Sequence, residues 1–194
     1  MIKIVTIDLD GTLFDPKKNV SKDNLEAIKK CQQLGVKIVV ATGRPISGVL
    51  PLLNELNLNT NNDYVILYNG AKIINVGTQE LIYSSTISGK EVKELYQEAL
   101  KLNIDFHAFR KNGELITPRH NPYTDVEATI NKVKDNIHDI VSLNDNDEFL
   151  KAMMVGEDLN VTRVIDEIKP IYKERFSVVR SSRIFLEFLD KKTN

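Results

Sequence analysis

The feature that most restricts the fold is an apolar, β-branched run from Ile2 to Leu9 that ends in carboxylates. A run of this kind is typical of a strand that is buried on both faces of a parallel sheet. Ligands of such sheets bind at the carboxyl ends of the strands. We therefore expect the chemistry of this protein to lie where the first strand ends.

The chain then repeats a pattern of strand, loop and helix. Ser21 is placed to cap a helix with apolar residues at helical spacing, and Gly35 is placed to end it. Further strands are predicted at Val36 to Ala41 and at Tyr64 to Tyr68. In the helix between them, Pro51 lacks an amide hydrogen and should kink the helix or delay its start. This order predicts an α/β fold with a doubly wound parallel core.

The pattern changes near Lys72, and from there we expect a second, α+β domain. Its predicted elements are a strand pair from Lys72 to Tyr83, helices over Ser88 to Leu102, Tyr123 to Val133 and Val161 to Tyr172, strands over Ile104 to Phe109, Glu114 to Thr117 and Phe149 to Val155, and a hairpin from Phe176 to Leu189. We accordingly divide the chain into residues 1–77, residues 78–190 and a short linker, residues 191–194.

The composition of the chain limits the kinds of molecule that it can bind. The 194 residues include 26 Lys and Arg against 27 Asp and Glu, a net charge of −1, so the chain lacks the cationic field that drives binding to nucleic acid or acidic lipid. Cys31 is the only cysteine, and its spacing from the histidines does not match a zinc site. The sequence has no secretory signal and no apolar run long enough to span a bilayer. We expect a cytoplasmic protein that binds neither nucleic acid nor membrane.

The strongest chemical signal is the pair Asp8 and Asp10, followed by Gly11. If strand geometry persists, the two carboxylates point the same way, and the glycine lets backbone amides approach an anion. One carboxylate could attack a phosphate while the other moves a proton. A phosphate and a carboxylate repel by several kcal/mol at about 4 Å, so a divalent cation is needed, and oxygen ligands favour Mg²⁺. Solvated turn acids are the competing, weaker interpretation.

A second candidate group follows the second strand. The Thr42 hydroxyl and the Gly43 amide could hold a phosphoryl group, and Arg44 could contact the rest of an anionic substrate. A simple helix start is the competing interpretation of this segment. It becomes the weaker one beside the carboxylate loop.

Several segments together resemble the Cof-type branch of the haloacid dehalogenase-like (HAD) hydrolases. They are IDLDGTL at Ile7 to Leu13, VVATGRP at Val39 to Pro45 and YNGA at Tyr68 to Ala71, followed by a long insert. FLKAMMV at Phe149 to Val155 and FLEFLDKKTN at Phe185 to Asn194 resemble the YidA-like sugar-phosphate phosphatases. The resemblance runs the whole length of the chain. It implies a HAD-like core, incomplete here, with an inserted α+β cap over residues 78–190.

The resemblance also implies roles for individual residues. Asp8 would be the nucleophile that forms an aspartyl-phosphate, and Asp10 the general acid and base. Mg²⁺ would be held by the Asp8 carboxylate and the Asp10 carbonyl. The phosphate would be held by the Leu9 amide, Thr42 and Gly43. The implied substrate is a small phosphorylated metabolite, most simply a sugar phosphate, and the cap would select its leaving group.

The sequence departs from the family pattern at its end. It stops at Lys192-Thr193-Asn194, where the resemblance predicts a phosphate-binding lysine and then an acidic GDxxND-type motif. With three strands in the order 3-2-1, the first strand becomes a sheet edge, and an apolar edge invites pairing with another chain. We therefore expect a truncated chain or fragment that is less stable and catalytically weaker than a complete one, unless another polypeptide supplies the missing strands, and that could self-associate through this edge.

Two alternatives to a phosphatase remain open. The same covalent intermediate could transfer its phosphoryl group to a second sugar, as in a phosphomutase. The chain could instead be a non-catalytic fragment or binding module that retains phosphate affinity.

Other polar residues are weaker candidates. His107 could face a substrate, but a structural histidine is the favoured interpretation. Arg110, Arg119 and Tyr123 are better explained as surface residues of the cap. For Asn69, a substrate role and a scaffold role are equally supported.

Overall fold

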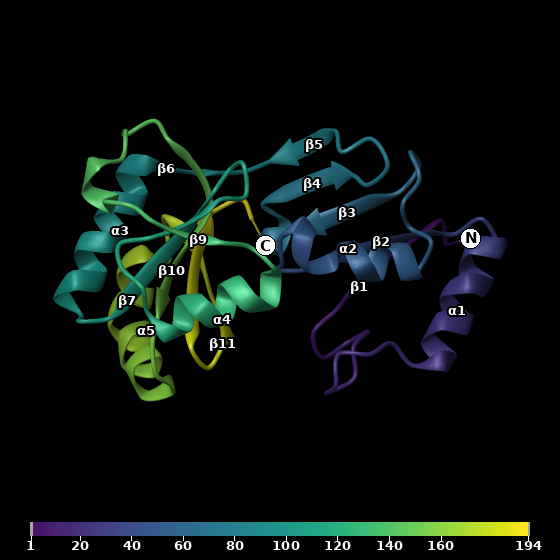
Figure 1. The fold of residues 1–194 in the computed structure, drawn as a ribbon, viewed down its shortest axis with the longest axis horizontal. Helices are drawn as coiled ribbons and strands as arrows, with labels where there is room; N and C mark the ends of the chain where they lie inside the picture. The colour runs from purple at the N-terminus through teal and green to yellow at the C-terminus, as the bar shows by residue number, and fades with distance from the viewer. Residues whose placement is uncertain (1, 194) are drawn as a thin grey trace. The chain divides into compact units, whose positions relative to one another are not determined.

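The structure of this protein is a computed structural model that describes residues 2–193 (Figure 1). It divides into a first unit, Met1–Ser84, and a second unit, Ser85–Asn194. The division falls after Ser84 and not after residue 77, because the strand that ends at Ser84 pairs within the first unit. The expected linker at residues 191–194 belongs to the second unit, where Thr193 is buried and its amide donates to the Asp190 carbonyl.

The first unit is built on one five-stranded sheet with the order β1-β2-β3-β4-β5. The first three strands are parallel, and the last two pair antiparallel. The strands are β1 (Ile4–Asp8), β2 (Lys37–Ala41), β3 (Tyr64–Leu67), β4 (Lys72–Asn75) and β5 (Leu81–Ser84). The predicted parallel arrangement and the edge position of the first strand are both confirmed.

Strand β1 is less buried than its sequence predicts. Ile2 and Ile4 are 70% and 59% exposed, whereas burial on both faces was expected. The reason is the edge position: among the described residues, β1 pairs with β2 alone. Only Leu9, just after the strand, is fully buried.

Helix α1 (Lys22–Gln33) begins and ends as the sequence predicts. The Ser21 hydroxyl accepts a hydrogen bond from the Asn24 amide at 3.2 Å, which satisfies one of the free amides of the first turn. Gly35 has a φ of +74°, a conformation that glycine adopts without steric cost, and it closes the carboxyl end of the helix.

Helix α2 (Ile46–Glu55) starts directly after Pro45 and runs through Pro51. Of the two effects expected from Pro51, a kink or a delayed start, the delayed start is therefore wrong. One missing amide does not outweigh the apolar face that the helix buries at Val49, Leu52 and Leu53.

The second unit contains a seven-stranded sheet with the order β11-β12-β10-β7-β8-β9, in which β6 also pairs with β10. The strands are β6 (Ile87–Ser88), β7 (Asp105–Arg110), β8 (Leu115–Thr117), β9 (Asp135–Ile137), β10 (Glu148–Val155), β11 (Phe176–Ser182) and β12 (Phe185–Asp190). The helices are α3 (Gly89–Lys101), α4 (Pro122–Asn131) and α5 (Asp158–Tyr172), and two 3₁₀ turns lie at Tyr68–Gly70, in the first unit, and Ile140–Ser142. Strands β6 and β9, which have two and three residues, were not predicted.

The two faces of this sheet differ in chemistry. One face packs against α3 and α5 in an apolar core, to which Phe106, Met154 and Phe188 contribute. Because side chains alternate along a strand, the intervening residues face the other way. There His107, Lys151 and Glu187 are buried polar groups, and the first two contact residues of α4.

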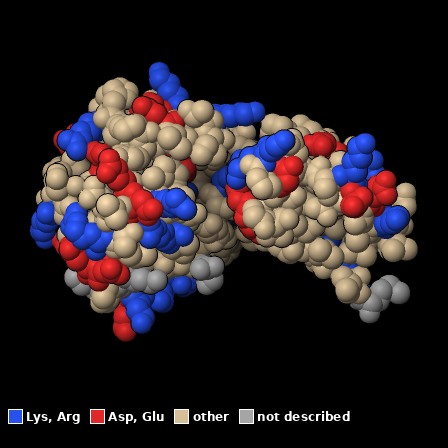
Figure 2. Space-filling model, turned by 90° about the horizontal axis from the view of Figure 1, so that it is seen from below, with Lys and Arg blue, Asp and Glu red and all other residues tan. Residues whose placement is uncertain are grey.

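Charges of both signs are mixed on the surface visible in Figure 2, where Lys and Arg alternate with Asp and Glu. No helix within residues 2–193 is long and apolar enough to cross a bilayer.

Candidate active site

The carboxylate loop turns sharply after β1. Asp8 is the last residue of the strand, so the alternation of side chains along a strand does not extend to Asp10. The Phe14 amide donates to the Leu9 carbonyl at 2.9 Å, and Gly11 has a φ of +88°, so the chain folds back on itself. The Asp8 side chain is exposed and forms no hydrogen bond or ion pair with the described residues.

The second strand brings Thr42, Gly43 and Arg44 to the same sheet edge. Asp8 is in parallel register with Ala41, so the residues after β2 follow beside the carboxylate loop. Thr42 is 5% exposed, and its amide donates to the Ile66 carbonyl at 3.0 Å. Its hydroxyl accepts a hydrogen bond from the Arg44 amide at 3.3 Å, which orders the turn.

Arg44 binds Asp10. Its Nε donates to Asp10 Oδ2 at 3.0 Å and its Nη2 to Asp10 Oδ1 at 2.8 Å, a bidentate pair. The guanidinium also lies over the Phe14 ring, 5.6 Å from its centroid. The sequence assigned Arg44 to the substrate, and in the structure its partner is the candidate acid and base.

Lys18 is the site residue that the sequence analysis missed. Its ammonium donates to Asp10 Oδ1 from a turn eight residues further along the chain. Burial would raise the pKa of the Asp10 carboxyl, but the hydrogen bonds from Arg44 and Lys18 outweigh it and hold that pKa below its ordinary value. Asp10 is therefore ionised at neutral pH. Only the adjacent pair Lys17-Lys18 could have drawn attention to this turn, and it does not say which lysine reaches the loop.

Asn69 supports the loop after β2. Its amide donates to the Thr42 carbonyl at 3.0 Å. A Cβ placed on Gly43 would lie 2.7 Å from Asn69 Oδ1, so only glycine fits here without moving that side chain. Tyr68 and Asn69 both have positive φ, near 52° and 53°, a costly conformation that clusters at functional sites. These contacts favour the scaffold role for Asn69.

Three of the polar residues considered in the second unit, His107, Arg110 and Arg119, have structural partners. His107 is fully buried; its Nδ1 lies 2.9 Å from Thr124 Oγ1 and its Nε2 lies 3.1 Å from Met153 Sδ. Burial lowers the pKa of His107 to about 3, so it is a neutral structural histidine, as favoured. Arg110 is paired with Asp147 at 3.1 Å, and Arg119 with Asp105 at 2.8 Å.

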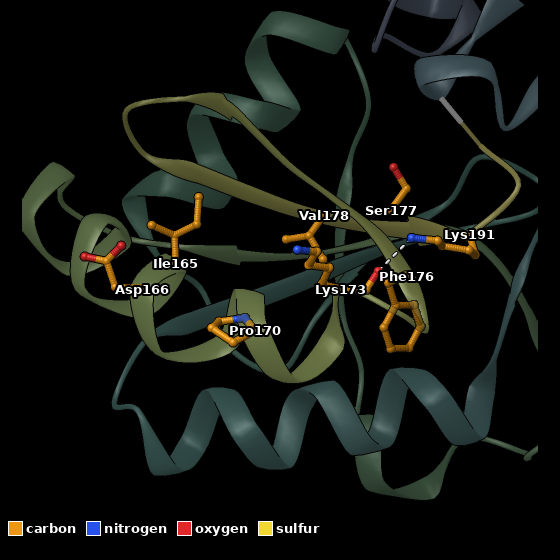
Figure 3. Close-up of a pocket in the computed structure, with 8 residues that line it drawn as sticks. All are labelled: Ile165, Asp166, Pro170, Lys173, Phe176, Ser177, Val178 and Lys191. Carbon is orange, nitrogen blue, oxygen red and sulfur yellow. Dashed lines mark hydrogen bonds between the residues drawn. The ribbon is translucent and has the colours of Figure 1, made fainter.

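A hollow of about 490 Å³ lies in the second unit between α5 and β11 (Figure 3). It contains none of the predicted site residues. Its lining is Ile165, Asp166, Pro170, Lys173, Phe176, Ser177, Val178 and Lys191, with Lys191 Nζ donating to the Lys173 carbonyl at 2.7 Å. On the surface of the same unit, His120, Asp125 and Asp135 bring three potential metal-ligand atoms within 4.8 Å of one another.

Comparison with known proteins gives a consistent result. Residues 5–194 match the family model described as haloacid dehalogenase-like hydrolase. A Bacillus subtilis (strain 168) protein named "Putative phosphatase YxeH" is 34% identical over 191 residues, which cover 97% of this chain and 70% of the relative.

Solved structures agree over the whole chain. A haloacid dehalogenase-like hydrolase from Bacteroides thetaiotaomicron is 29% identical with a TM-score of 0.82, and the match covers 100% of this chain and 73% of that one. A structure described as the HAD subclass IIB sugar phosphatase BT4131 is 21% identical with a TM-score of 0.75, covering 99% and 71% of the two chains. At 21% identity, the match to the second structure supports the fold alone.

Proposed function

The chain belongs to the haloacid dehalogenase-like hydrolase family, as its motifs predicted, and from this premise we propose that it hydrolyses small phosphate monoesters with Mg²⁺. The observation that carries the proposal is the placement of two aspartates with different surroundings at the end of β1. Asp8 is exposed and without a partner among the described residues, whereas Asp10 is held by two cations. A nucleophile needs the first environment, and a fixed proton-transfer group needs the second.

The reaction would proceed in two displacements. An oxygen of Asp8 attacks phosphorus, and the bond from phosphorus to the leaving oxygen breaks. Asp10, which must first take up a proton because Arg44 and Lys18 hold it ionised, gives that proton to the leaving oxygen and is ionised again. In the second displacement, the ionised Asp10 removes a proton from water, whose oxygen attacks phosphorus and releases Asp8 and inorganic phosphate. The bonds from Arg44 and Lys18 stabilise the ionised form of Asp10 that the second displacement requires.

The donor atoms at the site fit Mg²⁺. The Asp8 carboxylate and the Asp10 carbonyl are both oxygen ligands of the kind that this cation prefers. The Asp10 carboxylate is already occupied by Arg44 and Lys18, which leaves its carbonyl as the group to offer. When bound, the cation neutralises charge on the phosphate as the aspartate approaches.

The family motifs support a sugar phosphate as the substrate. The Leu9 amide, the Thr42 hydroxyl and the Gly43 amide would hold its phosphate, beside a buried turn that Asn69 braces. The second unit would act as the cap that contacts the leaving group.

We also infer that β1 supports self-association. Its free edge carries Ile4, and Ile2 just before it is exposed as well. An apolar groove of about 260 Å³ lies beside this strand and is lined in part by Val5, Ile7 and Ile28. A second copy pairing along this edge would bury these side chains.

The test is phosphate release from sugar phosphates and from a chromogenic monoester, with and without Mg²⁺. The proteins compared are the wild type, Asp8→Asn and Asp23→Asn, in which Asp23 is an exposed acid of α1 that serves as the matched control. We expect turnover that needs Mg²⁺, is lost in Asp8→Asn and is retained in Asp23→Asn. Equal turnover in the two variants would refute the aspartyl-phosphate route. Phosphate binding without turnover in the wild type would favour the binding module.

A further inference from the structure

We propose that Lys18 is a phosphate-binding residue. Its ammonium pairs with Asp10 before substrate binds, and it then leaves Asp10 to pair with the phosphate of the entering substrate. This inference rests on the proposed function, since it concerns the same site. It assigns a role to a residue outside both motifs that the sequence analysis identified. Three observations carry it: the rigid base of the Lys18 side chain, the unequal attachment of the two cations to Asp10, and the charge balance of the site.

The turn that carries Lys18 is fixed to the carboxylate loop. Asp15 Oδ1 accepts hydrogen bonds from the amides of Lys17 and Asn19, both at 2.8 Å, and the Lys18 amide donates to the Asp15 carbonyl at 2.9 Å. Backbone bridges join Phe14 to Val20 and Phe14 to Asp10. The backbone of Lys18 is thus held at a constant place beside Asp10.

The two cations are attached to Asp10 differently. Arg44 binds both carboxylate oxygens, lies over Phe14 and has a side chain that is only 16% exposed. Lys18 makes one contact, on the oxygen that Arg44 Nη2 already occupies, and its side chain is 58% exposed. If Lys18 leaves, Asp10 keeps a bidentate partner. Lys18 is therefore the cation that a competing anion can remove from Asp10.

The charges of the site favour a phosphate dianion over Asp10 as the partner of Lys18. Asp8, Asp10 and Arg44 together carry one net negative charge, and Lys18 brings the sum of the four to zero. A phosphate dianion would otherwise face a negative site until the metal arrives. It also offers an ammonium more charge than a carboxylate that is already paired with Arg44.

The experiment measures the affinity for inorganic phosphate by calorimetry in the presence of Mg²⁺, together with KM and kcat on a monoester. The proteins are the wild type, Lys18→Met, Lys18→Arg and Lys17→Met. Lys17 is the matched control, because it is an exposed lysine of the same turn and, among the described residues, only its backbone amide forms a hydrogen bond. Methionine keeps the length of the side chain and removes its charge.

We expect Lys18→Met to weaken phosphate binding about tenfold and to raise KM in proportion, as loss of a charged hydrogen bond does. Lys18→Arg should recover most of this affinity, and Lys17→Met should match the wild type. If turnover is absent but phosphate binding follows this pattern, the proposed catalysis fails and the assignment of Lys18 stands.

Three results would overturn the assignment. One is that Lys18→Met and Lys17→Met bind phosphate equally well. Another is that kcat falls in Lys18→Met while KM and phosphate affinity stay unchanged, which would make Lys18 only a support for Asp10. The last is that the wild type does not bind phosphate at all.

Discussion

Acid should destabilise this protein through one buried histidine. His107 is fully buried, and its pKa is lowered from 6.5 to about 3, first by burial and then by the nearby positive charge of Lys151. In the unfolded chain it has an ordinary pKa near 6.5. The stability that depends on neutral His107 is therefore complete above pH 6.5 and is lost as the pH falls toward 3, because only the unfolded chain takes up the proton.

The size of the effect follows from the two pKa values. One pKa unit corresponds to about 1.36 kcal/mol, so lowering the pH from about 7.5 to about 4.5 should remove about 2 to 3 kcal/mol from the free energy of unfolding. Full titration to pH 3 would bring the loss to about 4 to 5 kcal/mol. Domains of this size are stable by about 5 to 15 kcal/mol, so the change is a substantial part of the total.

The assay is urea unfolding followed by circular dichroism at a series of pH values, for the wild type and for His107→Asn. Asparagine keeps a polar atom near Thr124 Oγ1 and does not titrate. Carboxylates and the two other histidines, His120 and His138, are common to both proteins. The difference between the two pH dependences thus isolates His107. An equal fall in the free energy of unfolding of both proteins between pH 7.5 and pH 4.5 would refute the argument, even if one protein is less stable at every pH.

Three further changes test other parts of the structure. Lys151→Met should cost about 3 to 5 kcal/mol in urea unfolding, because it removes the buried ammonium that pairs with both Glu127 and Glu187, and a loss under about 1 kcal/mol would contradict this. Gly43→Ala should lower kcat/KM about tenfold in the phosphatase assay by pushing Asn69 aside, and unchanged kinetics would show that this contact is unimportant. Ser88→Ala should reduce the free energy of unfolding by about 1 kcal/mol, since it removes the capping box of α3, and an unaltered urea midpoint would count against the cap.

Local signals in the sequence were reliable where a few neighbouring residues decide the structure. Ser21 and Gly35 mark the two ends of α1 because capping depends on residues within one turn. The apolar runs at Val36 to Ala41 and Tyr64 to Tyr68 became β2 and β3, inner strands of the sheet in which alternate residues are buried. The same argument overestimated the burial of β1, whose exposure depends on having one neighbour in the sheet.

The candidate site was predictable in its composition and not in its contacts. The sequence by itself placed Asp8 and Asp10 after one strand and Thr42 after the next, because parallel strands end at a common edge. It determined the fold class in the same way, through the period of its apolar residues. Only the tertiary structure decided that Arg44 and Lys18 both bind Asp10, and that His107 is buried in contact with Thr124 of α4. Ion pairs and burial join residues distant along the chain, and no local pattern records which of many charged side chains will meet once the chain has folded.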